Sequence, residues 1–447
     1  MLTISGPKNP QFLQVANWIL NPVNYLEKTS QEYPDLFQTK VIPSADNVIF
    51  VSNPKILQQI LTNDRQQFIA SAEGNKILST LLGNYSVIML DGDRHKQRRQ
   101  LLMPPFHGQQ INNYANTITR ITKEIMEGAP VNQVVEARSL TQAITMNVIM
   151  EAVFGLSSGE RYNQLKSLLT SLLDIFRVPA KVAFLVFPSL QKDFGKWSPW
   201  GNFLALKAKI DELIYAEISE RRQLPPRDDI LSLLLSAQDP EGNPLTDEEL
   251  RDELITLLFA GHETTATALA WGIYWTHHLP EIKAKILIEL ASLADSEPTA
   301  ITRLPYLSAV CQETLRIYPV AMVTFPRIVQ TDTEIDGYFF PAYSSIMGCI
   351  YQTHHREDIY PNPDSFKPDR FLEKQFSPYE FLPFGGGVRR CLGEVLALFE
   401  FKLALAEIIA NYNIVLADSK PEKPQRRGLT LAPARGVPII IKSSNVT

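Results

Sequence analysis

The sequence predicts a mainly α protein of the α+β class, with a large helical region and small antiparallel sheets near the two ends of the chain. Apolar residues recur at helical spacing throughout the middle of the chain. Short runs of β-branched and aromatic residues between turn residues are fewer and lie toward the ends. No linker rich in Gly and Ser and no repeat interrupts the chain, so we expect a single domain over residues 1–447.

The first expected element is a strand at 48–52, where the run VIFVS is rich in β-branched residues. Helices are expected wherever apolar residues return every three or four positions. In chain order the expected helices are 141–155, 203–220, 247–278, 281–294 and 305–317, and they are followed by two strand-forming stretches at 334–350 and 429–442.

The 247–278 helix has a clear beginning. Thr246 and Glu249 have the spacing of a capping box, and Asp247 and Glu248 occupy the first turn, where the helix dipole favours negative charge. Apolar periodicity continues to about His278, which gives a helix of roughly 30 residues and ~45 Å. A helix of this length crosses a whole domain, so we expect it to be central and buried.

Composition and charge exclude several classes of protein. The formal charge of −5 disfavours a nucleic-acid binder, which needs a basic face. The three cysteines, Cys311, Cys349 and Cys391, are too widely spaced for a disulfide framework or a zinc site, which favours a reducing, cytoplasmic location. No stretch reaches the roughly 20 apolar residues that cross a bilayer, so we expect no transmembrane anchor and peripheral contact with a membrane at most. We further expect the protein to be a monomer.

A glycine-rich loop precedes the last long apolar segment of the chain. The loop reads FGGGVRRCLG from Phe384 to Gly393, and the segment EVLALFEFKLALAEII after it predicts a helix. Cys391 therefore lies at a helix N-terminus, where unpaired N–H groups and the helix dipole favour a thiolate. A thiolate is the form that ligates a haem iron, and glycines let the backbone pass close to a flat macrocycle.

Two other interpretations of this loop have to be weighed. A phosphate-binding loop would end in Gly-Lys-Ser/Thr, and this sequence does not. A buried structural cysteine beside a tight turn is the simpler alternative for Cys391. Cys311 and Cys349 instead lie in ordinary helix and strand patterns, where we expect each to be a small buried apolar residue.

The middle of the 247–278 helix contains residues that are unfavourable there, in the run AGHETT from Ala260 to Thr265. Gly costs about 1 kcal/mol relative to Ala inside a helix, and Thr hydroxyls compete for backbone carbonyls. These costs are understandable if the helix opens slightly to admit dioxygen and a chain of waters. A satisfied polar network in the core explains the same residues without a catalytic role.

The loop resembles the haem-binding signature of the cytochrome P-450 superfamily, Phe-x-x-Gly-x-Arg-x-Cys-x-Gly, at every fixed position. The resemblance, to members of the soluble bacterial type, implies the cytochrome P-450 fold and a haem-thiolate monooxygenase. It also implies that Cys391 ligates the iron of haem b and that Phe384 and Arg389 contact the cofactor.

The resemblance extends to the long helix, whose run Ala-Gly-x-Glu-Thr matches the oxygen-activating pattern of the family. It implies that Thr264 hydrogen-bonds dioxygen and that Glu263 relays protons, which makes both residues catalytic. It places Gly261 next to the cofactor and Ala260 next to the substrate. His262 falls at the variable position and is expected to be structural.

Two segments resemble the scaffold of the family. Glu313 and Arg316 match its Glu-x-x-Arg helix, and Pro-Asp-Arg-Phe at 368–371 matches its Pro-Glu-Arg-Phe with Asp for Glu. The resemblance implies a structural triad of Glu313, Arg316 and Arg370 that holds the thiolate loop in place. Without it, the first two residues are an ordinary ion pair one helical turn apart.

Several basic residues are candidates for the haem propionates. His95 and Arg99 resemble the family's Trp-x-x-x-Arg with His for Trp, and Arg98 stays an alternative because spacing alone does not separate neighbours. Arg327 resembles a further propionate contact. Ala321, Met322 and Val323, just before it, are additional candidates for substrate contact.

The resemblance also implies partners. Residues 172–203 are apolar, aromatic and broken by Pro and Gly, and they lie where the family has its access lid, which suits a lipophilic substrate such as a fatty acid or a terpenoid. Core packing explains many of these side chains equally well.

No Gly-x-Gly-x-x-Gly and no flavin domain is found, so we expect electrons from a ferredoxin with its NAD(P)H reductase. A cluster of basic residues is expected to steer this acidic partner to the protein, namely Arg94, Lys96, Arg98 and Arg390.

Three alternative functions remain open at this point. A peroxide-using or rearranging haem-thiolate enzyme would need no external reductant, and a haem sensor or carrier would show no turnover. A helical scaffold without a cofactor would be colourless when purified. The acid–alcohol pair Glu263–Thr264 favours monooxygenation with O2, because relatives with the first of these activities typically lack it.

Overall fold

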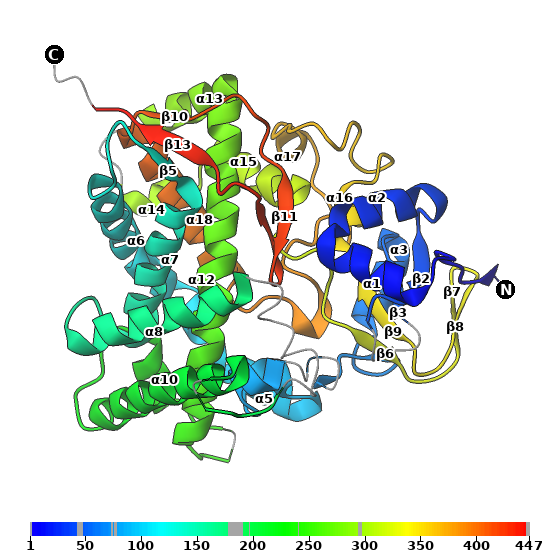
Figure 1. Cartoon of the computed structure of the whole chain (residues 1–447), viewed down its shortest axis with the longest axis horizontal. Helices are drawn as coiled ribbons and strands as arrows, with labels where there is room; N and C mark the ends of the chain where they lie inside the picture. The colour runs from blue at the N-terminus through cyan, green and yellow to red at the C-terminus, as the bar shows by residue number, and fades with distance from the viewer. Residues whose placement is uncertain are drawn as a thin grey trace.

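The computed structural model describes residues 2–42, 48–72, 75, 78–177, 191–195, 197–239, 241–293 and 297–443. Within them, most of the long helices gather on one side, and a five-stranded sheet with the N-terminal helices lies on the other (Figure 1). The mainly α fold class is therefore confirmed.

The first group of elements accompanies the five-stranded sheet and comprises the helices α1 (Gln11–Leu20), α2 (Pro22–Glu32) and α3 (Pro54–Thr62). Most of the chain from residue 79 onward forms the helical region. Its helices are α4 (Ser79–Leu82), α5 (Gly92–Leu102), α6 (Gln109–Glu127), α7 (Ala137–Phe154), α8 (Glu160–Arg177), α10 (Pro199–Arg221), α11 (Ile230–Ser236), α12 (Asp247–His278), α13 (Pro280–Ala291), α14 (Pro298–Ile301), α15 (Pro305–Ile317), α17 (Arg370–Glu373) and α18 (Glu394–Asn411). Helix α16 (Ile350–His354) instead lies beside α2 and contributes buried residues to the clusters around the five-stranded sheet (Figure 1).

Helix α12 runs through the centre of the helical region, as the sequence predicts (Figure 1). It begins with the expected capping box, in which Glu249 N donates to Thr246 Oγ1 at 3.2 Å and Thr246 N donates to Glu249 Oε2 at 2.9 Å. The helix is largely buried because α7, α10, α15 and α18 all pack against it. The helix that carries Glu263 and Thr264 is thus fixed from several sides.

The strands form small sheets. The largest has the order β2-β3-β9-β6-β4, and the others have the orders β1-β8-β7, β10-β13-β5 and β11-β12. The strands are β1 (Leu2–Thr3), β2 (Leu36–Thr39), β3 (Val48–Val51), β4 (Phe68–Ile69), β5 (Val134–Glu136), β6 (Arg327–Val329), β7 (Thr333–Ile335), β8 (Tyr338–Phe340), β9 (Ser345–Gly348), β10 (Ile414–Leu416), β11 (Pro424–Arg427), β12 (Thr430–Pro433) and β13 (Pro438–Ile441).

The sheets are not all antiparallel, which corrects the expectation from the sequence. Strand β3 pairs in parallel with β9, with Val48 opposite Ser345, and β1 pairs in parallel with β8. In both pairs the two strands are separated by several hundred residues of mostly helical chain, and such a long connection allows a parallel pairing that a tight hairpin does not. Local strand patterns carry no information about this pairing.

Buried apolar side chains form one large cluster in the helical region and two smaller ones around the five-stranded sheet. The large cluster includes Trp271 of α12 and Phe401 of α18, and Gly272 between them lies so close to Phe401 that an added Cβ would be 2.6 Å from its ring. In the described part of the chain, no helix combines the length and apolarity needed to span a bilayer.

Candidate active site

The loop before α18 is pressed against the end of α3. Gly387 begins the short 3-10 helix η5 (Gly387–Arg389) with φ of +64°, and a Cβ there would lie 2.0 Å from Asp64 Oδ2 and 2.8 Å from the Leu61 carbonyl oxygen. Asp64 Oδ2 also accepts a hydrogen bond from Val388 N at 2.8 Å. Glycine is required at this position by both the backbone conformation and the close approach.

Cys391 follows this loop, and its N–H donates to the Phe384 carbonyl at 2.9 Å. Its side chain is exposed, whereas Cys311 and Cys349 are buried. Of the three cysteines, only Cys391 is therefore accessible to a ligand.

The helix N-terminus does not by itself make Cys391 a thiolate. Burial raises the pKa of its thiol to about 11, and the Gly393 N–H, Arg99 and Arg390 lower it only in part. The dipole argument from the sequence therefore underestimates desolvation. A metal ion bound to the sulfur would deprotonate it outright, since a coordinating thiol loses its proton.

A cluster of basic side chains lies beside the loop. Burial and the charges of Arg389, Arg99, Arg65 and Arg327 lower the pKa of His95 to about 3. A cavity of about 390 Å³ is lined by His95, Arg99 and Arg65 together with Leu61, Asp64, Lys96, Gln100, Met103, Gly387 and Val388.

This basic cluster has few acidic counterparts. Within the described residues, Arg327 pairs with Asp64 at 3.2 Å and Arg389 with Asp91 at 3.0 Å, while the Nε atoms of both arginines are buried without a hydrogen-bond partner. Buried donors without acceptors and a surplus of positive charge fit a bound dianion such as the two propionates of haem. The donor set thus matches the group that a nearby thiolate would ligate.

Arg98 and Arg99 point to different places. The buried Arg98 donates to Glu253 Oε1 and the Tyr85 carbonyl, both at 2.9 Å, and to Glu249, so it is engaged by α12. Arg99 lies in the cavity with His95 and influences the pKa of Cys391. Consecutive residues on a helix are about 100° apart, which explains why spacing alone left the choice open.

The burial of Arg98 also corrects the basic cluster expected for the electron donor. Arg94, Lys96 and Arg390 are exposed, but Arg98 is not and cannot belong to an outer surface. Arg390 forms an ion pair with Glu394 at 2.6 Å.

On α12, the polar run is anchored to α7. The Glu263 carboxylate forms an ion pair with Arg138 and accepts from Gln142 Nε2 at 2.8 Å. Thr145 donates to the His262 carbonyl at 3.0 Å, and a Cβ on Gly261 would lie 2.9 Å from Ile149. Gly261 thus permits the close packing of α7.

Thr264 uses its hydroxyl within its own helix, donating to the Ala260 carbonyl at 2.6 Å. Ala260 is exposed although it sits in the middle of a central helix, so this side of α12 borders an interior space. The partners of Glu263 were not found from the sequence: Arg138 lies far away in the chain and belongs to no motif.

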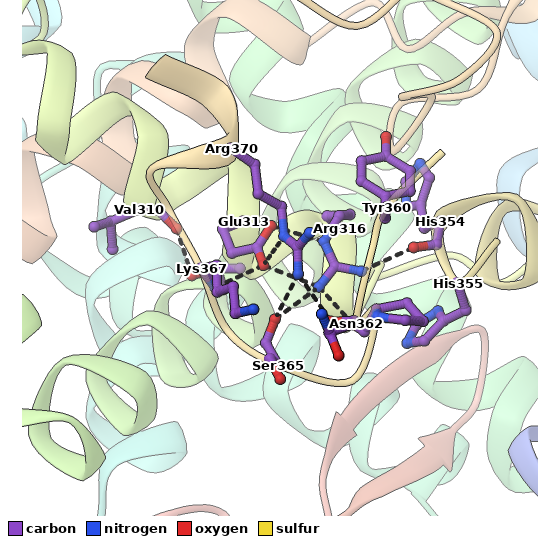
Figure 2. A network of polar contacts seen from close by, with 12 residues as sticks. Val310, Glu313, Arg316, His354, His355, Tyr360, Asn362, Ser365, Lys367 and Arg370 are labelled. Atoms are coloured by element: carbon purple, nitrogen blue, oxygen red, sulfur yellow. Dashed lines mark hydrogen bonds and ion pairs between the residues drawn. The ribbon is translucent and has the colours of Figure 1, made fainter. Parts of the chain in front are cut away.

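The predicted scaffold residues come together at one buried point (Figure 2). Arg316 donates to both Glu313 oxygens at 2.7 and 2.9 Å, and Arg370 donates to Glu313 Oε1 at 3.2 Å. Lys367 N donates to the same oxygen at 2.8 Å. The remaining arginine donors bind backbone carbonyls, among them those of residues 354 and 361–363, rather than the thiolate loop itself.

Of the substrate residues suggested by the sequence, Ala260 is exposed on α12, whereas the other three pack around the sheet. Met322 is buried in one of the smaller clusters, and Ala321 and Val323 pack against the clusters there. A different, entirely apolar cavity of only about 10 Å³ is lined by Leu81, Met146, Leu169, Leu172, Ile255, Leu258 and Phe259. Their helical spacing is visible in the sequence but is indistinguishable from that of core residues.

The expected lid at 172–203 is only partly covered by the structure. Residues 178–190 and 196 lie outside the described residues. Leu172, at its start, lines the apolar cavity.

Comparisons with known proteins agree with this geometry. The family model described as cytochrome P450 matches residues 5–439. The putative cytochrome P450 135A1 of Mycobacterium tuberculosis is 36% identical over 435 residues, which are 96% of this chain and 93% of that protein. The putative cytochrome P450 135B1 of Mycobacterium bovis is 32% identical over 98% of this chain and 91% of that protein.

Solved structures show the same fold. A retinoic acid-bound cyanobacterial CYP120A1 superposes with a TM-score of 0.83 at 25% identity, over 96% of each chain. The haem domain of cytochrome P450DA superposes with a TM-score of 0.85 at 22% identity, over 100% of this chain and 98% of that chain. With a family model that spans nearly all of its length and a relative at 36% identity, the chain belongs to the cytochrome P450 family of haem monooxygenases.

Proposed function

We propose that Cys391 ligates the iron of haem b and that the enzyme inserts one oxygen atom of O2 into a C–H bond of a lipophilic substrate. The observation that carries this proposal is the exposed sulfur of Cys391 beside a basic cluster with unpaired donors. Bound haem supplies the redox centre at which O2 is activated, so that one oxygen atom enters the substrate and the other leaves as water.

Other residues of the chain bind the haem and position dioxygen. His95, Arg99, Arg327 and Arg389 hold the propionates through charge-assisted hydrogen bonds, and Phe384 packs beside the macrocycle. Thr264 can turn its hydroxyl from the Ala260 carbonyl toward dioxygen.

Glu263 passes protons to Thr264 from its place beside Arg138 and Gln142. Its ion pair with Arg138 and the hydrogen bond from Gln142 hold the carboxylate in one orientation. The polar network in the helix and a catalytic role are therefore compatible.

The substrate proposed here is a fatty acid or a terpenoid. The cavity between α4, α7, α8 and α12 has a volume of only about 10 Å³, so such a substrate requires its side chains to move apart, but every residue that lines it is apolar, which favours a hydrocarbon chain over a polar molecule. The solved relative with bound retinoic acid, an isoprenoid carboxylic acid, supports the same class.

The electron donor is a ferredoxin with its NAD(P)H reductase, in the cytoplasm. Arg94 and Lys96 on α5 and Arg390 beside Cys391 are exposed, and although Arg390 pairs with Glu394, the first two offer positive charge on an acidic protein. Such a surface speeds the encounter with an acidic partner, and the rate falls as salt screens the charges. Reduction that does not slow with rising salt would contradict this partner.

Isotopically labelled dioxygen tests the reaction most simply. The purified, haem-loaded enzyme is supplied with ferredoxin, reductase, NADPH and a panel of fatty acids and terpenoids. The proposal predicts a hydroxylated product with one labelled oxygen atom. A product formed with peroxide alone, or without label, would instead support the peroxide-using or rearranging alternative.

A further inference from the structure

His354, the last residue of α16, lies fully buried between the Glu313–Arg316 pair and the segment that leads into the thiolate loop (Figure 2). Its backbone carbonyl accepts a hydrogen bond from Arg316 Nη1 at 2.8 Å. Its ring Nε2 accepts one from the backbone N–H of Leu382 at 3.0 Å. One residue thus contacts both the buried ion pair and the chain that approaches Cys391.

Backbone hydrogen bonds continue from Leu382 to the sulfur ligand. The Leu382 carbonyl accepts from Gly385 N at 2.9 Å, and the carbonyl of the neighbouring Phe384 accepts from Cys391 N at 2.9 Å. The triad itself makes no hydrogen bond to the loop 384–391 among the contacts of the described residues. The His354 ring therefore provides a polar connection between the two.

The ring of His354 is held in one orientation. It stacks on Phe381 with centroids 5.4 Å apart and an interplanar angle of 26°, and it meets Tyr360 edge-on at 6.3 Å. Tyr360 in turn donates to the Glu380 carbonyl at 3.0 Å. The segment 380–382 is consequently fixed at two adjacent points by residues that contact Arg316.

The chemistry of the ring indicates why a histidine is present. To accept from Leu382, Nε2 has to be unprotonated, and burial together with the charge of Arg316 lowers the pKa of His354 well below its usual value. The proton then resides on Nδ1, which is buried close to the backbone carbonyls of Leu315 and Arg316. An apolar side chain would offer no acceptor to the buried Leu382 N–H, so the acceptor at Nε2 is what the histidine contributes.

We propose that His354 is a positioning residue of the thiolate loop, which fixes the Leu382 backbone through Nε2 and so connects the buried Glu313–Arg316 pair to Cys391. The proposal rests on the proposed function in one respect, since it concerns the sulfur that ligates haem.

Three substitutions in the full-length protein distinguish the role of the hydrogen-bond acceptor Nε2 of His354 from that of its aromatic ring. His354→Phe keeps the aromatic stacking and removes the acceptor, whereas His354→Gln places an amide oxygen near the position of Nε2. The matched control is His355→Phe, because the neighbouring ring bonds only to Tyr351 of its own helical turn, at 2.8 Å. Far-UV circular dichroism verifies that each variant is folded.

Two readouts report on the loop. In haem-loaded protein, the reduced carbon-monoxide spectrum gives the ratio of thiolate-ligated to other haem. In haem-free protein, the rate of alkylation by iodoacetamide reports on Cys391, because the other two cysteines are buried. We expect His354→Phe to lower the ratio about tenfold and to speed alkylation several-fold, with both restored by His354→Gln and unchanged by His355→Phe.

A folded His354→Phe variant with the wild-type ratio and alkylation rate would overturn the proposal, and so would a His354→Gln variant as impaired as His354→Phe. If His354→Phe does not fold, His354→Asn replaces it, since its shorter side chain does not reach Leu382. A wild-type enzyme without any thiolate-ligated spectrum would contradict the proposed function alone, and the alkylation rates would still decide the role of His354.

Discussion

Replacement of Gly387 by alanine tests how closely the thiolate loop is fitted to α3, and Gly385 offers a matched control. Both glycines have a positive φ, of +64° and +68°, so an alanine at either costs about 1–2 kcal/mol of backbone strain. Alanine also lowers the conformational entropy of the unfolded chain relative to glycine, which offsets roughly 0.4–1 kcal/mol of that cost. An added Cβ at Gly385 meets nothing within 4 Å, and we therefore expect Gly385→Ala to destabilise the protein by about 1 kcal/mol.

At Gly387 the same Cβ would lie 2.0 Å from Asp64 Oδ2 and 2.8 Å from the Leu61 carbonyl oxygen. Asp64 then has to leave Val388 N and Arg327, whose hydrogen bonds to it are charge-assisted and contribute about 1.5–3 kcal/mol each. Even at the lower limit, Gly387→Ala should destabilise the protein by about 4 kcal/mol in total.

The assay is thermal unfolding followed by circular dichroism, together with the haem content of the purified variants. At roughly 2.1 cal/mol/K of unfolding entropy per residue, 447 residues give about 0.9 kcal/mol/K. We therefore expect Tm to fall by about 1 °C for Gly385→Ala and by about 4 °C for Gly387→Ala, with haem lost mainly from the second. Equal effects of the two substitutions would refute the idea that contact with α3 holds the loop.

Three further outcomes are expected. Glu313→Gln leaves the buried Arg316 and Arg370 without a counterion, so chemical unfolding should show a loss of about 3–5 kcal/mol; a change below 1 kcal/mol would contradict the buried ion pair. Arg138→Ala should lower product formed per NADPH by about tenfold without changing substrate binding, because Glu263 loses its partner; unchanged coupling would argue against the relay. Burial and the charge of Lys283 lower the pKa of His277 to about 4. As the pH falls from 6.5 to 4, His277 is therefore protonated in the unfolded state but not in the folded state, so the free energy of unfolding of the wild type should fall by up to about 3 kcal/mol. Unfolding measured across this pH range should show a smaller decline for His277→Gln, and an unchanged decline would contradict the burial of a neutral His277.

The elements that the sequence predicts correctly are those with local signals. The α12 helix has a capping box at Thr246 and unbroken apolar periodicity to His278, and both of its ends are where they were expected. The loop from Phe384 to Gly393 is contiguous, so its residues are necessarily close in space. Local interactions therefore account for α12 and for the immediate surroundings of Cys391.

What the sequence did not predict depends on contacts between distant segments. Arg138 and Glu263 are 125 residues apart, and the approach of α7 to α12 at Gly261 is what joins them. Arg98 and Arg99 differ only in the elements that surround them, and it is Arg98 that forms ion pairs with acidic residues of α12. The parallel pairing of β3 with β9 and the lining of the apolar cavity arise in the same way.

Desolvation is a further property that local reasoning missed. The position of Cys391 before α18 suggested a low thiol pKa, but desolvation by the surrounding protein raises it. Which protein atoms surround a side chain follows from the packing of the whole chain.

The central claim is that Cys391 is the thiolate ligand of haem, and the reduced carbon-monoxide difference spectrum of the Cys391→Ser variant tests it most directly. Cys349→Ser, at a buried cysteine, is the matched control. We predict that the thiolate-type spectrum of the wild type disappears in Cys391→Ser and persists in Cys349→Ser. A thiolate-type spectrum that survives in Cys391→Ser would contradict the assignment of the ligand.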